Sequence, residues 1–311
     1  TTLENGLTIQ DSTGNQYVWV EVPKTAEVYP TAGLAIKDFS DEEYDSIETD
    51  LHTYTSDYRK DGCVDEYENT EGTGQEIAGF TEEQYYALKK KMLKSIYQNG
   101  GFYIGKYETG IENAPKTSGS ADTAPTETPV IKQNAYPYNY VTCRQAQTLA
   151  NSMESGSYTT SLLFGVQWDL TLKYLETKGT KQADLNSDSI AWGNYKDNLW
   201  NITNADSKYS TDYGNTWTSG AYGTKASSAS ILLSTGASDT FAKQGIYDLA
   251  GNVVEWTLEN PIRNSSPSIR GNFYRDSKNN NKYSAQDHET GTYVHFYNIN
   301  VDDTGFRVAL Y

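Results

Sequence analysis

Residues able to carry catalytic or metal chemistry are few in this chain. It contains three histidines, His52, His288 and His295, and two cysteines, Cys63 and Cys143. No HExxH, HxxxH or CxxC spacing occurs, so zinc and non-haem iron catalysis is not expected. Two cysteines can form at most one disulfide, so a disulfide scaffold is excluded as the basis of the fold.

One pair of residues has the chemistry of a cation site. Asn252 and Glu255 stand three apart beside Gly251 and could offer an amide oxygen and a carboxylate to a hard cation. Alternatively, Asn252 caps a turn and Glu255 pairs with an arginine. Both interpretations are open from the residues alone.

An acid/base pair is a second possibility, because His288 or His295 could act with Asp287 or Glu289 near neutral pH. No nucleophile motif, oxyanion-hole motif or phosphate loop accompanies them. We therefore expect a non-catalytic protein with no required cofactor, and an enzyme with an unfamiliar site is the alternative.

Composition restricts the partners. The chain has 311 residues, with 25 Lys and Arg against 41 Asp and Glu, which gives a net charge of −16. Such an excess of negative charge disfavours nucleic acids and anionic membranes. The mean hydropathy is −0.70, and no apolar run approaches the roughly 20 residues that cross a bilayer, so direct membrane insertion is not expected.

The elements that must position these groups follow from periodicity and caps. Alternating residues on both sides of Gly14 and Asn15 predict two strands within 7–22. Capping boxes at 81–84 and 142–145 predict helices over about 81–99 and after 142, and a third is predicted over about 164–177. Residues 38–80 are acidic and lack sustained periodicity, which indicates a surface insertion, and 183–223 have the composition of a long loop.

Several segments resemble the formylglycine-generating-enzyme (sulfatase-modifying factor) family, whose fold is a variant of the C-type lectin fold. They are GIYDLAGNVVEWT at 245–257, IRG at 269–271 and GFRVAL at 305–310, with supporting pieces at 17–23, 102–109 and 161–169. The resemblance implies a single α+β domain over 1–311 with short twisted sheets, about three helices and long irregular loops. It also implies calcium at Asn252 and Glu255. We expect Trp256 and Phe306 in the core, and Arg307 as a partner for a carboxylate.

The sequence departs from this family at its catalytic centre. The resemblance implies a copper-binding cysteine pair between 270 and 311, and no cysteine occurs there. Soft copper needs thiolate ligands, so oxidase chemistry is not expected. Residues 264–304 are instead rich in Asn, Tyr, Ser, Asp and His. This composition is typical of recognition surfaces, and its position is similar to that in the variable proteins of diversity-generating retroelements. An ordinary asparagine-rich loop in a degenerate family member is the other interpretation.

The sequence therefore predicts a receptor- or adhesin-type protein that displays a variable binding segment at about 264–304. Its ligand would be a protein or a cell-surface molecule. The location would be extracellular, on a bacterial surface or a phage particle. The alternative is a degenerate or atypical formylglycine-generating-enzyme-like enzyme. Our candidate ligand-binding residues are aromatic, histidine or short polar residues: Tyr274, Asp276, Tyr283, His288, Tyr293, His295, Tyr297, Asn298 and Asn300.

Overall fold

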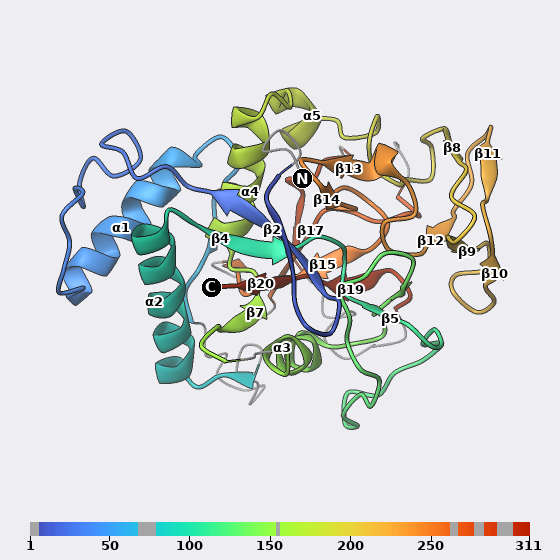
Figure 1. Cartoon of the computed structure of the whole chain (residues 1–311), viewed down its shortest axis with the longest axis horizontal. Coiled ribbons are helices and arrows are strands. Elements are labelled where there is room, and N and C mark those ends of the chain that lie inside the picture. The colour runs from blue at the N-terminus through green and yellow to red at the C-terminus, as the bar shows by residue number, and fades with distance from the viewer. Residues whose placement is uncertain (1–5, 68–78, 154–155, 262–266, 277–282, 291–300) are drawn as a thin grey trace.

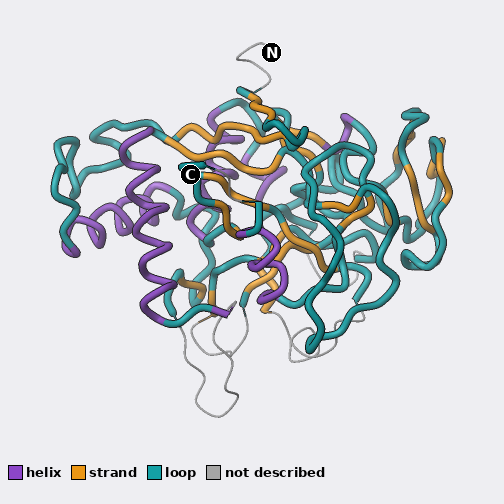
Figure 2. The backbone as a smooth tube through the Cα atoms, turned by 60° about the horizontal axis from the view of Figure 1, so that its bottom comes forward, coloured by secondary structure: helices purple, strands orange, loops and turns teal. Residues whose placement is uncertain are grey.

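The computed structural model describes residues 6–67, 79–153, 156–261, 267–276, 283–290 and 301–311. These residues form a mixed α+β structure with five α-helices and several small, mostly antiparallel sheets. The helices gather at one end of the molecule, and loops make up much of the other (Figures 1 and 2). No helix in this part of the chain is both long enough and apolar enough to cross a lipid bilayer.

A five-stranded sheet brings the two ends of the chain together. Its order is β1 (Thr8–Gln10), β2 (Gln16–Glu21), β4 (Gly101–Gly105), β20 (Val308–Leu310) and β7 (Thr160–Leu162). The two strands predicted around Gly14 and Asn15 are confirmed as β1 and β2, which pair antiparallel. The second strand contributes to the core, because Val18 and Val20 are fully buried.

The three predicted helices are present. They are α2 (Glu82–Asn99), α3 (Cys143–Asn151) and α4 (Gly165–Thr177), and α5 (Gln182–Asn186) follows them. Thr81 and Thr142 accept from the third residue of their helices, as the capping boxes require. Helix α2 ends at Gly100, which adopts the left-handed conformation that glycine tolerates best.

The interpretation of 38–80 as a surface insertion is wrong for its first half. Helix α1 (Asp41–Tyr54) lies there and buries Ile47 and Leu51 against the main core, beside α2 (Figure 1). Its start carries a capping box formed by Ser40 and Glu43. That signal was present in the sequence, but the polar and acidic residues around it hid the short apolar stripe.

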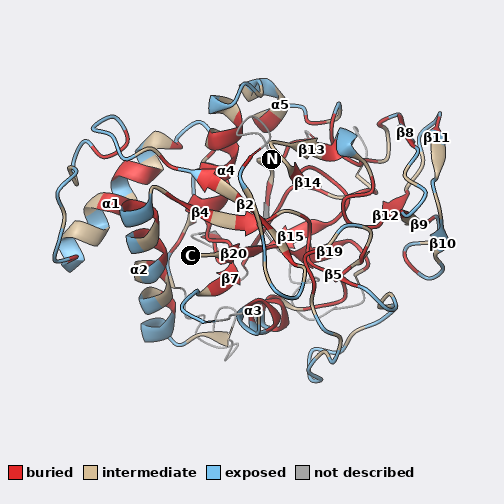
Figure 3. Ribbon diagram, viewed as in Figure 1, coloured by how far each residue is buried: buried red, intermediate tan, exposed pale blue. Residues whose placement is uncertain are grey.

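A four-stranded sheet holds the C-terminal region. Its order is β18 (His288–Thr290), β17 (Ser268–Arg270), β15 (Val254–Trp256) and β19 (Thr304–Phe306), with β15 and β19 parallel. The core positions expected for Trp256 and Phe306 are confirmed. The chain passes from β19 into β20 of the other sheet through Arg307, and buried residues concentrate where the two sheets lie (Figure 3).

The expectation of a long loop over 183–223 is also wrong. Besides α5, the segment forms β8 (Trp200–Ile202), β9 (Lys208–Ser210) and β10 (Thr218–Ser219), and it ends where β11 (Gly223–Lys225) begins. Strands β8 and β11 pair with each other, and β9 pairs with β10 and with β12 (Leu232–Leu233). Trp200 and neighbouring apolar residues make a small separate core there. This core stabilises strands of two or three residues, which are too short to show a strong alternation in the sequence.

Three further pairs of short strands complete the described structure. They are β3 (Cys63–Val64) with β16 (Asn260–Pro261), β5 (Gly110–Ile111) with β6 (Tyr136–Pro137), and β13 (Ala242–Lys243) with β14 (Ile246–Tyr247). A short 3₁₀ helix, Asp239–Phe241, precedes β13. Both cysteines are buried and free.

The role of α1 can be tested by truncating its core residue. Replacing Leu51, which is 0% exposed, with alanine should lower the free energy of unfolding by about 2–5 kcal/mol, because it leaves a cavity. Leu34→Ala is the control, since Leu34 is 46% exposed and its truncation should cost far less. Urea denaturation measures both. If both variants lost the same small amount of unfolding free energy, α1 would be a surface appendage.

Candidate binding site

An open pocket of about 510 Å³ lies where the turn after α1 meets the C-terminal segment. One wall comes from the turn at 59–61, and the other from 284–288, which lead into β18. Its lining is polar and carries both signs of charge: Arg59, Lys60, Asp61, Asn186, Ser284, Gln286, Asp287 and His288.

Two hydrogen bonds hold the walls together. The Lys60 ammonium donates to the carbonyl of His288 at 2.8 Å. The Gln286 amide donates to the carbonyl of Tyr58, also at 2.8 Å. The pairing of β3 with β16 fixes the chain just beyond the turn. Residues more than 220 positions apart in the sequence therefore share one pocket.

A second hollow of about 400 Å³ lies on the other side of the same turn. Arg59 and Asp61 line both spaces. The remaining lining residues come from the second half of α1 and the turn after it: Thr49, His52, Thr53 and Ser56. No local motif indicates this arrangement, because it depends on the proximity of residues far apart in the sequence.

Tyr274 and Tyr283, the two candidate tyrosines within the described residues, do not form an exposed patch. Tyr274 is 0% exposed and its hydroxyl donates to Asp302. Tyr283 is 3% exposed; its hydroxyl donates to Asp197 at 2.6 Å, and its ring packs 4.7 Å from that of Tyr195, centroid to centroid. The expectation that these two rings supply open contact area is wrong, because each phenol finds a carboxylate and the ring fills the space beneath it.

The other candidates have different outcomes. Asp276 is half-buried, accepts from the Asn272 amide at 3.0 Å, and its pKa is raised to about 6, chiefly by burial. His288 is only 4% exposed, yet it belongs to the pocket wall. The rest lie outside the described residues: Tyr293, His295, Tyr297, Asn298 and Asn300.

A buried ionic cluster lies behind the His288 wall. The Arg270 guanidinium binds Asp169 at 2.6 Å and Glu259 at 3.2 Å, and all three side chains are buried. The His288 imidazole lies 3.3 Å from Glu259. Burial opposes ionisation of Glu259, but Arg270 and His288 outweigh it and lower its pKa to about 2. Burial raises the pKa of Asp169 to about 8 despite the same arginine.

This environment affects the chemistry of His288. Burial lowers its pKa, and the nearby Arg270 lowers it further, so the imidazole is neutral at pH 7. Its carboxylate neighbour is Glu259 rather than the Asp287 considered from the sequence, and Asp287 accepts from Asn272 at 2.7 Å. The acid/base pair of His288 with Asp287 is therefore not formed.

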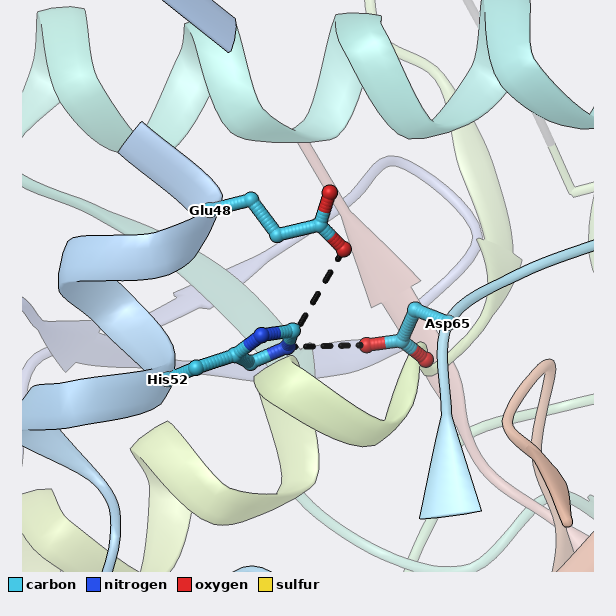
Figure 4. A group of neighbouring side chains, drawn as sticks. All are labelled: Glu48, His52 and Asp65. Carbon is cyan, nitrogen blue, oxygen red and sulfur yellow. Dashed lines mark ion pairs between the residues drawn. The ribbon is translucent and has the colours of Figure 1, made fainter. Parts of the chain in front are cut away.

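Glu48, His52 and Asp65 form the one group of described residues whose ligand atoms lie close enough to share a metal ion (Figure 4). The His52 ring lies 4.0 Å from Glu48 and 3.9 Å from Asp65. However, the Lys89 ammonium already binds both Glu48 oxygens, at 3.0 and 2.9 Å. The two Asp65 oxygens accept from backbone N–H groups at the start of α4. These carboxylates are satisfied without a metal, so the group is an ion-paired junction between α1, α2 and α4.

Glu255 follows the second interpretation open from the sequence. It binds Arg307 at 2.6 and 3.0 Å, which confirms the structural role expected for that arginine. Arg307 also donates to the carbonyls of Gly105 and Tyr247. The Arg307 guanidinium therefore neutralises Glu255, the carboxylate that would bind the ion in the calcium interpretation.

Asn252 adopts a left-handed conformation with φ of 62°, as a turn residue does. Its amide oxygen accepts from the Asn194 side chain and from Leu233 N, each at 3.0 Å. Its amide nitrogen donates to Glu108 at 2.7 Å. With both ends of the amide engaged, the geometry gives no support to a calcium ligand at Asn252.

No family model matches the sequence, and no curated protein matches it. Among solved structures, Treponema denticola variable protein 1 is similar over 68% of this chain and 84% of that chain, with 15% sequence identity and a TM-score of 0.33. Similarity at this level carries neither a fold nor a function over to this chain.

The two interpretations of Glu255 predict different responses to calcium. Glu255→Gln should lower the free energy of unfolding by about 3 kcal/mol, because it leaves the buried Arg307 without its counter-charge. The loss and the parent's stability should be the same with calcium and with EDTA. The control is Glu21→Gln, whose exposed pair with Lys178 should contribute under about 1 kcal/mol. A parent protein destabilised by EDTA would support the calcium interpretation instead.

The buried imidazole predicts a pH dependence. The folded pKa of His288 lies below the value of about 6.5 for an unfolded chain, so the unfolded chain binds more protons and stability falls as pH drops below that value. His288→Gln should lose less stability than the parent between pH 7.5 and 5.5, because the variant lacks the imidazole. All other titrating groups are the same in both proteins. Unfolding free energies at the two pH values measure this, with Gln286→Ala as a nearby control that removes no titratable group. Identical slopes for parent and His288→Gln would contradict the assignment.

Proposed function

We propose that this chain is a non-enzymatic ligand-binding protein, in which a C-type lectin-type framework of the formylglycine-generating-enzyme subtype presents a diversified C-terminal segment, about 264–304. The pocket between 59–61 and 284–288 carries this proposal, because it places half-buried polar side chains of that segment, Gln286 and Asp287, on a fixed wall. The ligand would be a protein or a cell-surface molecule outside a bacterial cell or on a phage particle.

The placement of the family-like segments supports the framework part of the proposal. Segments 17–23, 102–109, 161–169 and 305–310 contribute to the five-stranded sheet, although they are scattered along the chain. Segments 245–257, 269–271 and 305–310 contribute to the four-stranded sheet. Conserved motifs of one fold should meet in this way, since a family keeps the residues that hold its core.

The chemistry of the pocket supports binding over catalysis. Its histidine is buried and neutral beside Glu259, and Asp287, one of its two acidic residues, is held by an amide. The Ser284 hydroxyl, which also lines the pocket, donates to the Leu185 carbonyl rather than to a base. The lining instead combines amides, charges of both signs and hydroxyls, which are groups that give directional contacts.

Burial divides the proposed variable segment into two classes. Arg270, Tyr274 and Tyr283 are buried and each binds a carboxylate, so replacing them would disturb the framework. Gln286 and Asp287 reach the pocket and are half-buried, so they can change with less cost. A diversified segment should therefore vary at the second class and stay constant at the first.

Sequencing the 3′ end of the gene across a population tests the proposal. Replacements should concentrate within 264–304 at adenine-containing codons, include Gln286 or Asp287, and spare Arg270 and Tyr274. A nearby template copy of the same stretch should accompany the gene. Codons 101–105 of β4 are the internal control and should be constant. Substitutions spread evenly over both regions, with no template copy, would rule out diversification.

A further inference from the structure

We propose that Arg59 is a fixed anchor for an oxyanion, a carboxylate or a phosphate, on the ligand that enters the pocket. The inference deepens the proposed function and rests on it in one respect, that the pocket takes a ligand. It adds the chemical class of the bound group and assigns a role to a residue outside the proposed variable segment.

The first support comes from comparing which group each described arginine binds. In this acidic chain, Arg270, Arg275 and Arg307 each bind a carboxylate. Arg144 is exposed to solvent. Arg59 is half-buried and, among the described residues, has no ion pair or hydrogen bond to its side chain. A partly desolvated guanidinium without a counter-charge is unfavourable in the free protein, and a bound anion would remove that cost.

The second support is position. Arg59 lines both hollows, so it is accessible to a ligand in either of them. Lys60 stands beside it, fixed by its bond to the His288 carbonyl. Hydroxyl groups of Thr49 and Ser56 line one side, and the amide of Asn186 lines the other. These groups are further hydrogen-bond donors in the two hollows that Arg59 lines. The planar fork of the Arg59 guanidinium itself matches the oxygen pair of a carboxylate or phosphate.

The acidic residues of the pocket narrow the ligand class. Asp61 and Asp287 face the same space as the two cations, so the lining has no net positive charge. A long polyanion such as nucleic acid would meet these carboxylates and the chain's charge of −16. A single oxyanion bound through the arginine fork avoids that repulsion, so we assign an isolated acidic group on a larger ligand.

The anchor would also be independent of diversification. Arg59 lies in the turn after α1, far in sequence from 264–304, and the hydrogen bond from Lys60 to the main-chain carbonyl of His288 keeps the turn beside the segment. A constant charge next to replaceable side chains would hold one common feature of many ligands. The neighbouring residues would then decide among those ligands.

Arginine side-chain NMR tests the anchor directly. The full chain, with labelled arginine Nε–Hε groups, is titrated with an end-capped glycine peptide carrying a single glutamate as the carboxylate probe and with sodium phosphate as the phosphate probe. Hexalysine is the negative control. The Arg59 signal should shift saturably with at least one of the two anions and not with hexalysine, and the anion that shifts it identifies the chemistry.

Matched variants decide whether the fork is responsible. Arg59→Lys keeps the charge and removes the fork, and it should weaken anion binding by about tenfold or more. Arg144→Lys makes the same change at an exposed arginine and should leave binding unchanged. An Arg59 signal that moves with neither anion, or equal affinities for Arg59→Lys and the parent, would overturn the anchor. Codon variation at Gln286 and Asp287 is measured separately, so the anchor and the proposed function can fail independently.

Discussion

Two arginines sealed from solvent hold the C-terminal third of this protein to the rest of the chain. Arg270 on β17 reaches Asp169 on α4, and Arg307 between β19 and β20 reaches Glu255 on β15. A buried guanidinium is stable only when carboxylates and carbonyls satisfy its donors. Each arginine therefore requires its partners in place at once, and this couples the four-stranded sheet to α4 and to the five-stranded sheet.

The same constraint explains why Tyr274 and Tyr283 lie inside. The chain leaves Arg270, turns back along β18 and re-enters the sheet at β19, so the described residues of the segment begin and end at buried strands. Between these points Tyr274 donates to Asp302, and Tyr283 donates to Asp197. Tyrosine is common both at recognition surfaces and beneath them, because its ring needs burial and its hydroxyl needs a partner. Composition alone does not separate the two uses.

Local signals in the sequence were sufficient for the elements with strong caps or alternation. Strands β1 and β2 and helices α2, α3 and α4 were predictable, since each depends on residues within one or two turns of itself. Helix α1 was missed because its buried face rests on few apolar residues, Ile47 and Leu51 among them, in an acidic stretch. The short strands of 200–225 were missed because tertiary pairing, not alternation, defines them.

The site was less predictable than the fold because its walls come from opposite ends of the chain. Asn252 and Glu255 had the chemistry and spacing of a cation site, but their partners, Glu108 and Arg307, are 144 and 52 residues away. The sequence left the choice open, and only the packing resolves it for Glu255. The pocket has the same origin, since Lys60 and His288 are 228 positions apart. No local pattern could have indicated Arg59.

The proposed binding segment can be replaced only at some of its positions, and electrostatics decides which ones. Residues that neutralise buried charges cannot change without a cost of several kcal/mol, whereas half-buried polar residues at the pocket can change at little cost. In the proposed binding protein, stability and recognition would therefore depend on different depths, because the ionic clusters lie beneath the pocket residues that we propose to vary. Because Lys60 contacts the backbone of His288 rather than its side chain, the wall at 59–61 keeps its position whichever side chains the segment carries. A main-chain contact of this kind allows a constant cation to stand beside changing neighbours.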